Sequence, residues 1–211
     1  MRQAKHEIRT YSADTALVAE RRKHIVQHAL RLFARKGYDR TTMDEVLNSC
    51  GMSKGALYHY VGSKEDILAL AIEDASRRQA VALDALSEKI AYINTADALG
   101  EAIRAYLELI DNLYDTQRVL ERETFSIPRY YRIKVLNNGI RVRQFFEGIL
   151  QKGVDSGEFQ VPNVSFMAYF LCSACLAWTG RKWLLGKRYS LSDYRREVTE
   201  TTLKTVMPVL A

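Results

Sequence analysis

The chain of 211 residues contains only three cysteines and no long hydrophobic segment. Cys50, Cys172 and Cys175 are an odd number, and no apolar signal segment precedes them. We therefore expect a protein of the reducing cytoplasm rather than a secreted domain held by disulfides. The most apolar stretch, residues 164–178, is shorter than the run of about 18 apolar residues that a membrane span requires. We expect no membrane partner.

The sequence also lacks the local motifs of common enzyme classes. It contains no phosphate-binding P-loop, no His-Glu-x-x-His zinc motif and no segment that we interpret as a Gly-x-Ser-x-Gly nucleophile elbow. His24 and His28 have a metal-chelating spacing, but no third ligand lies nearby, so we expect no metal site. Residues 172–175 form a Cys-x-x-Cys sequence in an apolar segment, which we interpret as buried packing, with a redox-sensing pair as the alternative. We predict a protein that is not an enzyme and uses no cofactor.

No segment alternates apolar and polar residues as a half-buried strand does. Apolar residues instead recur at helical spacing, as from Ile25 to Ala29, so the sequence predicts an all-α fold. We expect Thr95 to cap one helix and Asp66 to be the capping-box partner of Ser63. The expected helices cover residues 16–36, 42–50, 53–60, 63–90, 95–114, 116–125, 128–152 and 163–185, and a last one begins after residue 190 or 192 and ends before residue 208.

The most informative stretch runs from residue 41 to residue 64. Thr42 is followed three residues later by Glu45, an arrangement in which each side chain bonds a free backbone N–H of the other. Gly51 can adopt the positive φ that a tight turn needs, and Ser53 can cap a second helix anchored inward by Leu57. Two short amphipathic helices joined by a glycine turn are typical of a helix-turn-helix.

The charge of this stretch indicates an anionic partner. No Asp or Glu occurs between Asn48 and Ser63, and Lys64 follows directly. Residues 1–72 hold 12 Lys and Arg against 8 Asp and Glu, so one third of the chain carries most of the net charge of +6. Gly55 lies inside the second short helix, where it costs up to about 1 kcal/mol relative to Ala, which makes sense if a partner approaches the backbone closely.

These residues resemble the DNA-binding domain of TetR-family transcriptional regulators over about residues 19–70. The segments that carry the resemblance are Thr41-Thr42-Met43-Asp44-Glu45-Val46, Gly51-Met52-Ser53-Lys54-Gly55-Ala56-Leu57-Tyr58-His59-Tyr60 and Ser63-Lys64-Glu65-Asp66-Ile67-Leu68. The resemblance implies an N-terminal three-helix domain with a helix-turn-helix (residues 1–62) and a larger helical domain for dimerisation and effector binding (residues 63–211). It further implies a homodimeric repressor that a small-molecule effector releases from a palindromic operator in double-stranded DNA.

The resemblance also implies which residues contact DNA: Thr42, Ser53, Lys54, Gly55, Tyr58, His59 and Lys64. Lys54 and His59 can donate to base edges in the major groove. Tyr58 and Lys64 are better suited to phosphate contacts, which set the register. Thr42 at a helix N-terminus can add another phosphate contact. For Tyr60 we favour a packing role.

Two further surfaces have alternative interpretations. The predicted effector-binding residues, suited to an apolar or amphipathic ligand, are Arg122, Phe125, Tyr130, Phe145, Phe166, Tyr169, Phe170 and Trp178. The alternative is that these are core aromatics with a solvated arginine. The predicted dimer contacts are Ala168, Leu171, Cys172, Cys175, Thr179, Val198, Thr202, Leu203 and Val206, and the alternative is that they belong to the internal core.

A different class of function also fits the sequence. The chain could be a helical small-molecule-binding protein, or an enzyme without recognisable motifs, whose basic head does not read DNA. Residues 1–13 carry several basic side chains and could be an arm that follows the DNA backbone or a tail without such a role. Binding to duplex DNA separates these interpretations.

Overall fold

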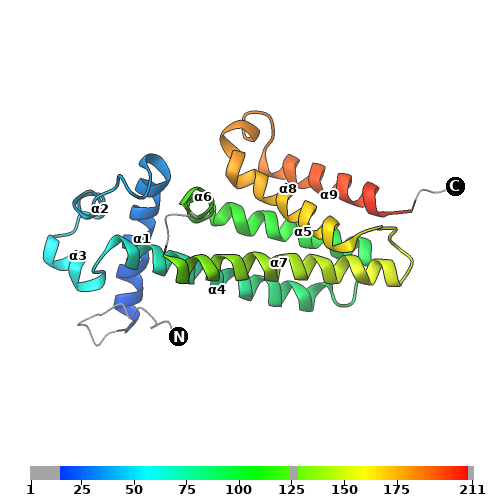
Figure 1. Cartoon of the computed structure of the whole chain (residues 1–211), viewed down its shortest axis with the longest axis horizontal. Coiled ribbons are helices and arrows are strands. Elements are labelled where there is room, and N and C mark those ends of the chain that lie inside the picture. Colours follow the sequence, from blue (N-terminus) through cyan, green and yellow to red (C-terminus); the bar gives the residue numbers. More distant parts are fainter. Residues whose placement is uncertain (1–14, 124–127, 209–211) are drawn as a thin grey trace. The chain divides into compact units, whose positions relative to one another are not determined.

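A computed structural model describes residues 15–123 and 128–208, and these residues form nine helices and no strand (Figure 1). The all-α prediction is confirmed. The predicted N-terminal arm lies outside the described residues, as does Phe125. The helices are α1 (Thr15–Lys36), α2 (Met43–Cys50), α3 (Lys54–Tyr60), α4 (Lys64–Ile90), α5 (Thr95–Asn112), α6 (Tyr114–Glu123), α7 (Arg129–Asp155), α8 (Val164–Leu185) and α9 (Leu191–Val206).

The chain divides into two compact units, which are described separately below. Unit 1 comprises Met1–Arg77 and Asp115–Val135, and unit 2 comprises Arg78–Tyr114 and Leu136–Ala211. Helices α4 and α7 therefore supply residues to both units. The predicted boundary between residues 62 and 63 divides a DNA-binding domain from an effector-binding domain. It does not coincide with the boundaries of the two compact units, and it stays a prediction.

The core of unit 1 forms around the apolar stripe of α1. Ile25, Ala29 and Phe33 are completely buried, as their helical spacing predicts. Val46 of α2 and Leu57 of α3 are also completely buried and belong to the same cluster. The two short helices α2 and α3 are therefore held against α1 by one hydrophobic core.

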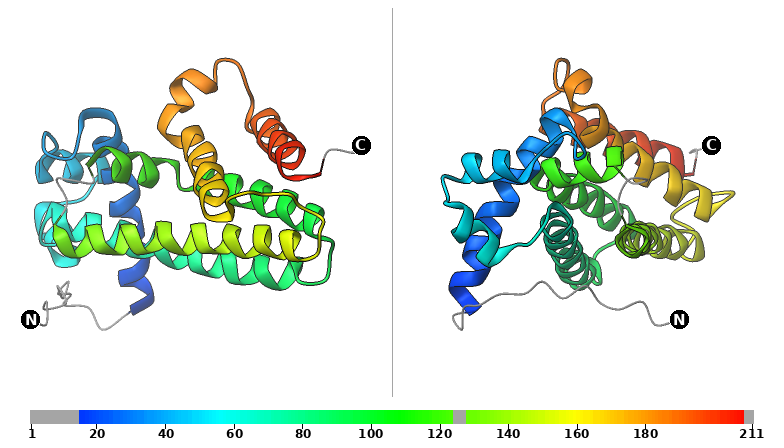
Figure 2. Two further views of the ribbon diagram at one scale, coloured as in Figure 1. Left: turned by 45° about the vertical axis from the view of Figure 1, so that its right-hand side comes forward. Right: turned by 60° about the vertical axis from the view of Figure 1, so that its left-hand side comes forward.

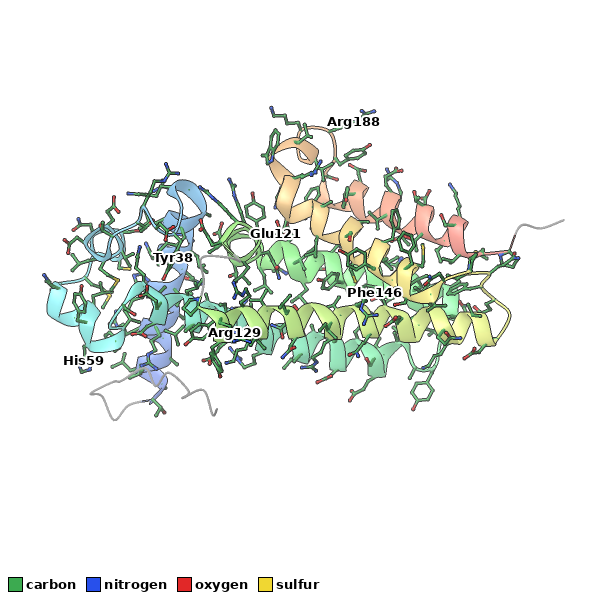
Figure 3. The ribbon with its side chains drawn as sticks, in the orientation of Figure 1. Tyr38, His59, Glu121, Arg129, Phe146 and Arg188 are labelled. Atoms are coloured by element: carbon green, nitrogen blue, oxygen red, sulfur yellow. The ribbon has the colours of Figure 1, made fainter. Side chains whose placement is uncertain are left out.

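The core of unit 2 forms around α5, which packs against α8 and α9. Leu99, Ile103 and Leu107 are completely buried on α5, and Phe146 of α7 packs edge-on against Tyr106 with ring centroids 5.7 Å apart (Figure 3). Each such side chain contributes about 1.5–3 kcal/mol when it is fully buried. Over the described residues, no helix combines the length and the apolarity that crossing a bilayer demands.

Three local predictions differ from the structure in detail. Asn94, not Thr95, caps α5, because its side chain accepts a hydrogen bond from the backbone N–H of Asp97 at 2.8 Å. Ser63 Oγ accepts the N–H of Asp66 at 3.2 Å, which is one half of the predicted capping box, and Asp66 Oδ2 accepts the N–H of Gly62 at 2.8 Å. Helix α6 also begins two residues earlier than predicted. These are ends of elements, where the sequence signal is weakest.

The small residues of α8 that we proposed for a dimer interface face the interior of their own chain. Ala168, Leu171 and Cys175 are completely buried, and Thr179 is 1% exposed. On α9, Val206 is likewise completely buried. The alternative interpretation, internal core, is therefore correct for these positions, because α5 and α9 already cover this face of α8.

Helix α8 bends before its end. Arg181 has φ −124° and ψ 20°, values outside the helical range, and the segment after it turns away from the axis (Figure 2). The indole Nε1 of Trp178, just before the bend, donates to Asp111 of α5 at 2.7 Å. Lys182, just after it, forms an ion pair with the same carboxylate. One partly buried polar contact on each side fixes the bend against α5.

Two glycines of α7 allow a matched test of packing in unit 2. A Cβ at Gly153 would lie 2.0 Å from the ring of Phe159, which is 4% exposed, whereas a Cβ at Gly148 would meet nothing within 4 Å. We expect Gly153→Ala to lower the melting temperature, because the buried ring must move. Gly148→Ala should leave it unchanged or raise it, since Ala favours a helix by up to about 1 kcal/mol. Thermal denaturation by circular dichroism checks both, and equal melting temperatures would contradict the packing argument.

Candidate DNA-binding surface

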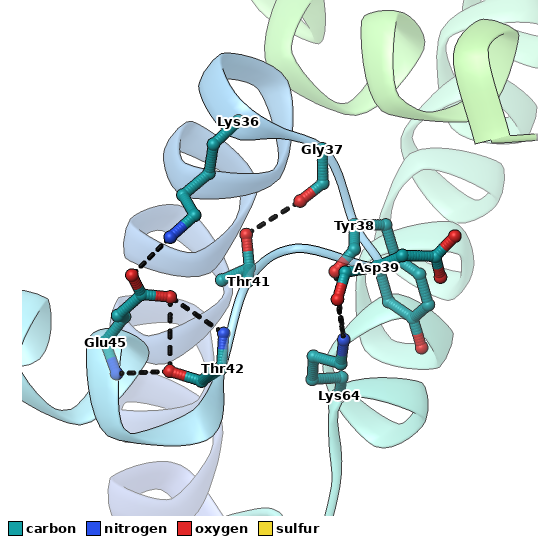
Figure 4. A network of polar contacts seen from close by, with 8 residues as sticks. All are labelled: Lys36, Gly37, Tyr38, Asp39, Thr41, Thr42, Glu45 and Lys64. Atoms are coloured by element: carbon teal, nitrogen blue, oxygen red, sulfur yellow. Dashed lines mark hydrogen bonds and ion pairs between the residues drawn. The ribbon is translucent and has the colours of Figure 1, made fainter.

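Helix α2 begins with the capping box that the sequence predicts. Thr42 Oγ1 accepts the N–H of Glu45 at 3.3 Å, and Glu45 Oε2 accepts the N–H of Thr42 at 2.9 Å. Lys36 at the end of α1 forms an ion pair with the other carboxylate oxygen (Figure 4). The pKa of Glu45 is lowered to about 2. The hydrogen bond from Lys36 is the larger cause, and the hydrogen bond from the N–H of Thr42 is the next. The start of α2 is therefore fixed to the end of α1 at neutral pH.

The turn between α2 and α3 also has the predicted geometry. Gly51 adopts φ 64° and ψ 31°, the left-handed conformation, and its N–H donates to Asn48 O at 3.3 Å. Ser53 caps α3 by accepting the N–H of Ala56 at 3.3 Å. Residues 41–60 form the predicted helix-turn-helix.

The outward face of α3 carries most of the predicted DNA contacts. Lys54 and Gly55 are exposed, and the side chain of Tyr58 is 41% exposed. His59 is half-buried and lies edge-on to Tyr60, with ring centroids 5.0 Å apart (Figure 3). A Cβ at Gly55 would meet nothing within 4 Å. Packing within the fold therefore does not require glycine at position 55.

Lys64 has an internal role that sequence reasoning missed. Its Nζ donates to Tyr38 O at 2.9 Å and to Asp39 O at 3.2 Å, and lies 4.7 Å from the centre of the Tyr38 ring (Figure 4). The ammonium group thus attaches the start of α4 to the loop after α1. Its three donors leave one for another acceptor, so a phosphate contact by Lys64 stays a prediction.

Side chains of α1 hold the C-terminal ends of both short helices, where carbonyl groups have no partner within the helix. Arg22 Nε donates to Tyr60 O at 3.1 Å, and His24 Nε2 donates to Cys50 O at 3.2 Å. His28 Nδ1 is hydrogen-bonded to Ser49 Oγ at 3.0 Å. The two histidines thus position the helix-turn-helix. Among the residues that the structure describes, no three His, Cys, Asp or Glu side chains gather as metal ligands.

Residues 51–55 do spell Gly-x-Ser-x-Gly, the residue pattern of a nucleophile elbow. A nucleophile elbow places that serine on a sharp turn between a strand and a helix. Here the turn follows helix α2, and the Ser53 oxygen is used as a helix cap. The structural context of an elbow is therefore missing at Ser53.

The predicted effector residues of unit 1 lie on two helices. Arg122 of α6 is exposed and approaches the carboxylate of Glu123, Nε to Oε1, at 3.5 Å. Tyr130 of α7 is half-buried against the core of unit 1. Their role in effector binding stays a prediction.

The predicted effector residues of unit 2 have very different exposures. Trp178 is 2% exposed, and Phe145 is half-buried against the same core. Phe166, Tyr169 and Phe170 of α8 are 66%, 64% and 54% exposed. The structure therefore separates these five aromatics into a buried group and an exposed face of α8.

The cysteines of the Cys-x-x-Cys sequence are poorly suited to thiolate chemistry. Burial raises the pKa of Cys172 to about 12, and burial also raises the pKa of Cys175, which is completely inaccessible. Because the thiolate is the reactive form, these environments favour the packing interpretation.

Comparison with known proteins gives one consistent result. Residues 25–71 match the family described as "Bacterial regulatory proteins, tetR family", and residues 93–181 match "Tetracyclin repressor-like, C-terminal domain". The HTH-type transcriptional regulator HbdR of Aromatoleum sp. (strain CIB) is 26% identical over 96% of this chain and 86% of its own. The HTH-type transcriptional regulator YfiR of Bacillus subtilis (strain 168), itself uncharacterized, is 30% identical over 72% of this chain and 75% of its own.

A solved structure shares the fold. The transcriptional regulator FadR from Bacillus subtilis, in complex with stearoyl-CoA, superposes with a TM-score of 0.66 at 20% identity, over 86% of this chain and 97% of that one. The all-α fold, the helix-turn-helix geometry and the similar proteins all indicate the same family. This chain belongs to the TetR family of DNA-binding transcriptional regulators.

Proposed function

We propose that the protein is a homodimeric repressor that leaves a palindromic operator when it binds a small-molecule effector. The observation that carries the DNA-binding part is the outward face of α3. It is free of carboxylates, exposes Lys54 and Tyr58, and contains a glycine at position 55 for which the fold has no need. We infer that the protein acts by binding rather than by catalysis, in the cytoplasm where bacterial operators are found.

The geometry of unit 1 supports a division of roles among the DNA contacts. A helix lying in the major groove reads base edges with the residues of its exposed face, here Lys54 and His59, while Gly55 allows close approach. Thr42 and Lys64 lie at the N-termini of α2 and α4, where backbone N–H groups and positive charge favour phosphate. We assign Tyr58 to a phosphate as well.

The exposed aromatic face of α8 supports a homodimer. Phe166, Tyr169 and Phe170 form one continuous apolar face on a helix whose other side is buried. Large adjacent apolar side chains are rarely left in water, and a second copy of the chain is the occupant that a two-fold operator requires. One helix-turn-helix contacts too few base pairs to select a site alone.

The effector proposal is an apolar or amphipathic small molecule bound in unit 2. The stearoyl-CoA of the Bacillus subtilis FadR complex supports this class of ligand, although that similarity shows only the fold. Helix α4 begins four residues after the end of α3 and contributes Leu83 and Leu86 to the core of unit 2. We propose that the effector shifts α4 and so changes the separation of the two α3 helices in the dimer.

The DNA-binding proposal is tested by salt titrations with the DNA upstream of the coding region. We expect Lys54→Ala to relax sequence preference by about 1–3 kcal/mol at one operator position. Lys64→Ala should weaken all sequences alike and lower the salt slope by about one. It should also lower the melting temperature, since two backbone carbonyls lose their donor. Lys187→Ala, an exposed lysine after α8, is the control and should bind as wild type does.

Two outcomes would contradict this assignment. If wild type binds no preferred site at low salt, the protein does not read DNA with this surface. If Lys54→Ala and Lys187→Ala weaken binding equally, α3 contributes only general charge.

Gly55→Ala separates the demands of folding from those of DNA binding. Because nothing lies within 4 Å of the added methyl group and Ala favours a helix by up to about 1 kcal/mol, we expect an unchanged or raised melting temperature. Operator affinity should nevertheless fall, because the methyl group occupies the space of close approach. Gly139→Ala of α7, equally unobstructed, is the control and should keep full affinity. If Gly55→Ala binds the operator with full affinity, DNA does not approach the backbone closely at position 55.

The dimer proposal is tested by charging the exposed face of α8. We expect Phe166→Glu together with Phe170→Glu to yield a monomer in sedimentation equilibrium and to weaken operator binding, because carboxylates would be buried against each other. Val81→Glu, at a position on α4 that is 63% exposed, is the control and should remain dimeric. A dimer that survives both α8 substitutions would show that another surface joins the subunits.

A further inference from the structure

Unit 1 also contains a concave surface to which α3 contributes no residue. It is a cavity of about 680 Å³, lined by the C-terminal half of α1, the C-terminal end of α2 and the start of α6. Leu32 and Ala34 form an apolar part of its wall. The volume lies in the range of small-molecule sites, about 300–1,000 Å³.

The charged side chains of this cavity are mostly cationic. Arg31 and Arg35 are four residues apart on α1, and Arg118 joins them from α6, against the single carboxylate of Asp115. Within the described part of the chain, neither Arg31 nor Arg35 forms an ion pair. Three guanidinium groups around a hollow repel one another, and each can bind an oxyanion with two parallel N–H bonds. The arrangement is suited to an anion with several oxygens.

His28 adds a titratable group to the same wall. Its Nδ1 is hydrogen-bonded to Ser49 Oγ, which also lines the cavity. Burial, the adjacent His24 ring 4.5 Å away and the charge of Arg31 lower the pKa of His28. Burial first, and then the positive charge around the ring, therefore disfavour the protonated form of His28. A bound anion would oppose that environment and favour the protonated ring.

We propose that this cavity binds a small-molecule oxyanion carrying two or more negative charges, such as a phosphorylated metabolite, at a site separate from α3. The guanidinium groups would hold the phosphate and the apolar wall would contact the organic part. Such a ligand joins α6 to the ends of α1 and α2 within unit 1, the same ends that position the helix-turn-helix. It would act as a second regulatory ligand beside the effector of unit 2.

The first experiment measures inorganic pyrophosphate binding to the full-length protein by isothermal titration calorimetry at low ionic strength. We expect one saturable site per protomer in wild type. The double variant Arg31→Gln/Arg35→Gln should bind at least about tenfold more weakly, because two charge-assisted contacts are lost. Arg118→Gln should also weaken binding. Arg129→Gln, an exposed arginine of α7 in the same unit, is the control and should bind within about twofold of wild type.

The second experiment uses wild type alone, so it does not depend on how a variant folds. The pKa of each histidine is measured by NMR in sodium sulfate and in sodium chloride of equal ionic strength. Sulfate stays doubly charged over the titration of histidine. We expect sulfate to raise the pKa of His28 and to leave that of His59 on α3 unchanged.

Four results would overturn the proposal. One is the absence of saturable pyrophosphate binding, and another is an equal loss in Arg129→Gln and the double variant. The third is a double variant that binds pyrophosphate normally but loses operator affinity, which would assign these arginines to a DNA phosphate. An equal sulfate effect on His28 and His59 would likewise show only general screening.

Discussion

The burial of Leu57 is the contact on which the candidate DNA-binding surface depends. Helix α3 has seven residues, too few to be stable alone in water, and Leu57 is its one buried side chain. This anchor fixes the rotation of the helix, and the Ser53 cap fixes its start. Lys54 and Tyr58, three residues before and one after the anchor, are then exposed. The orientation of the outward face of α3 follows from this hydrophobic contact, the Ser53 cap and the hydrogen bond from Arg22 to Tyr60 O.

The parts of this surface that sequence reasoning could predict are local ones. The capping box at Thr42, the left-handed turn at Gly51 and the buried stripe of α1 each depend on residues within a few positions of one another. The contacts of Lys64 and Arg22 could not be predicted in this way, because they reach carbonyl groups 26 and 38 residues away. Any exposed carbonyl can accept such a bond, so residue type alone gives no signal.

Helix α8 shows why periodicity failed to assign its faces. The helix is apolar on nearly every side, so hydrophobic spacing does not distinguish the inner from the outer face. Small residues suggested a close helix contact between subunits and aromatics suggested an interior. The structure buries Ala168 and Cys175 under α5 and α9 and leaves Phe166 and Phe170 exposed, whereas the aromatic Trp178 is buried. Only the three-dimensional neighbours of the helix decide this.

Unit 1 has two cationic surfaces on one small core, and that placement has a thermodynamic consequence. The ends of α2 and α3 are held by His24 and Arg22, and the cavity is lined by His28 and Arg31 of the same helix. A ligand that shifts α1 therefore changes the contacts that orient α3. Linkage requires DNA to change the affinity for that ligand by the same factor, commonly 5- to 150-fold for coupled sites. If an anion binds to the arginines of the cavity, its binding would change the affinity for the operator, although the two ligands occupy different surfaces.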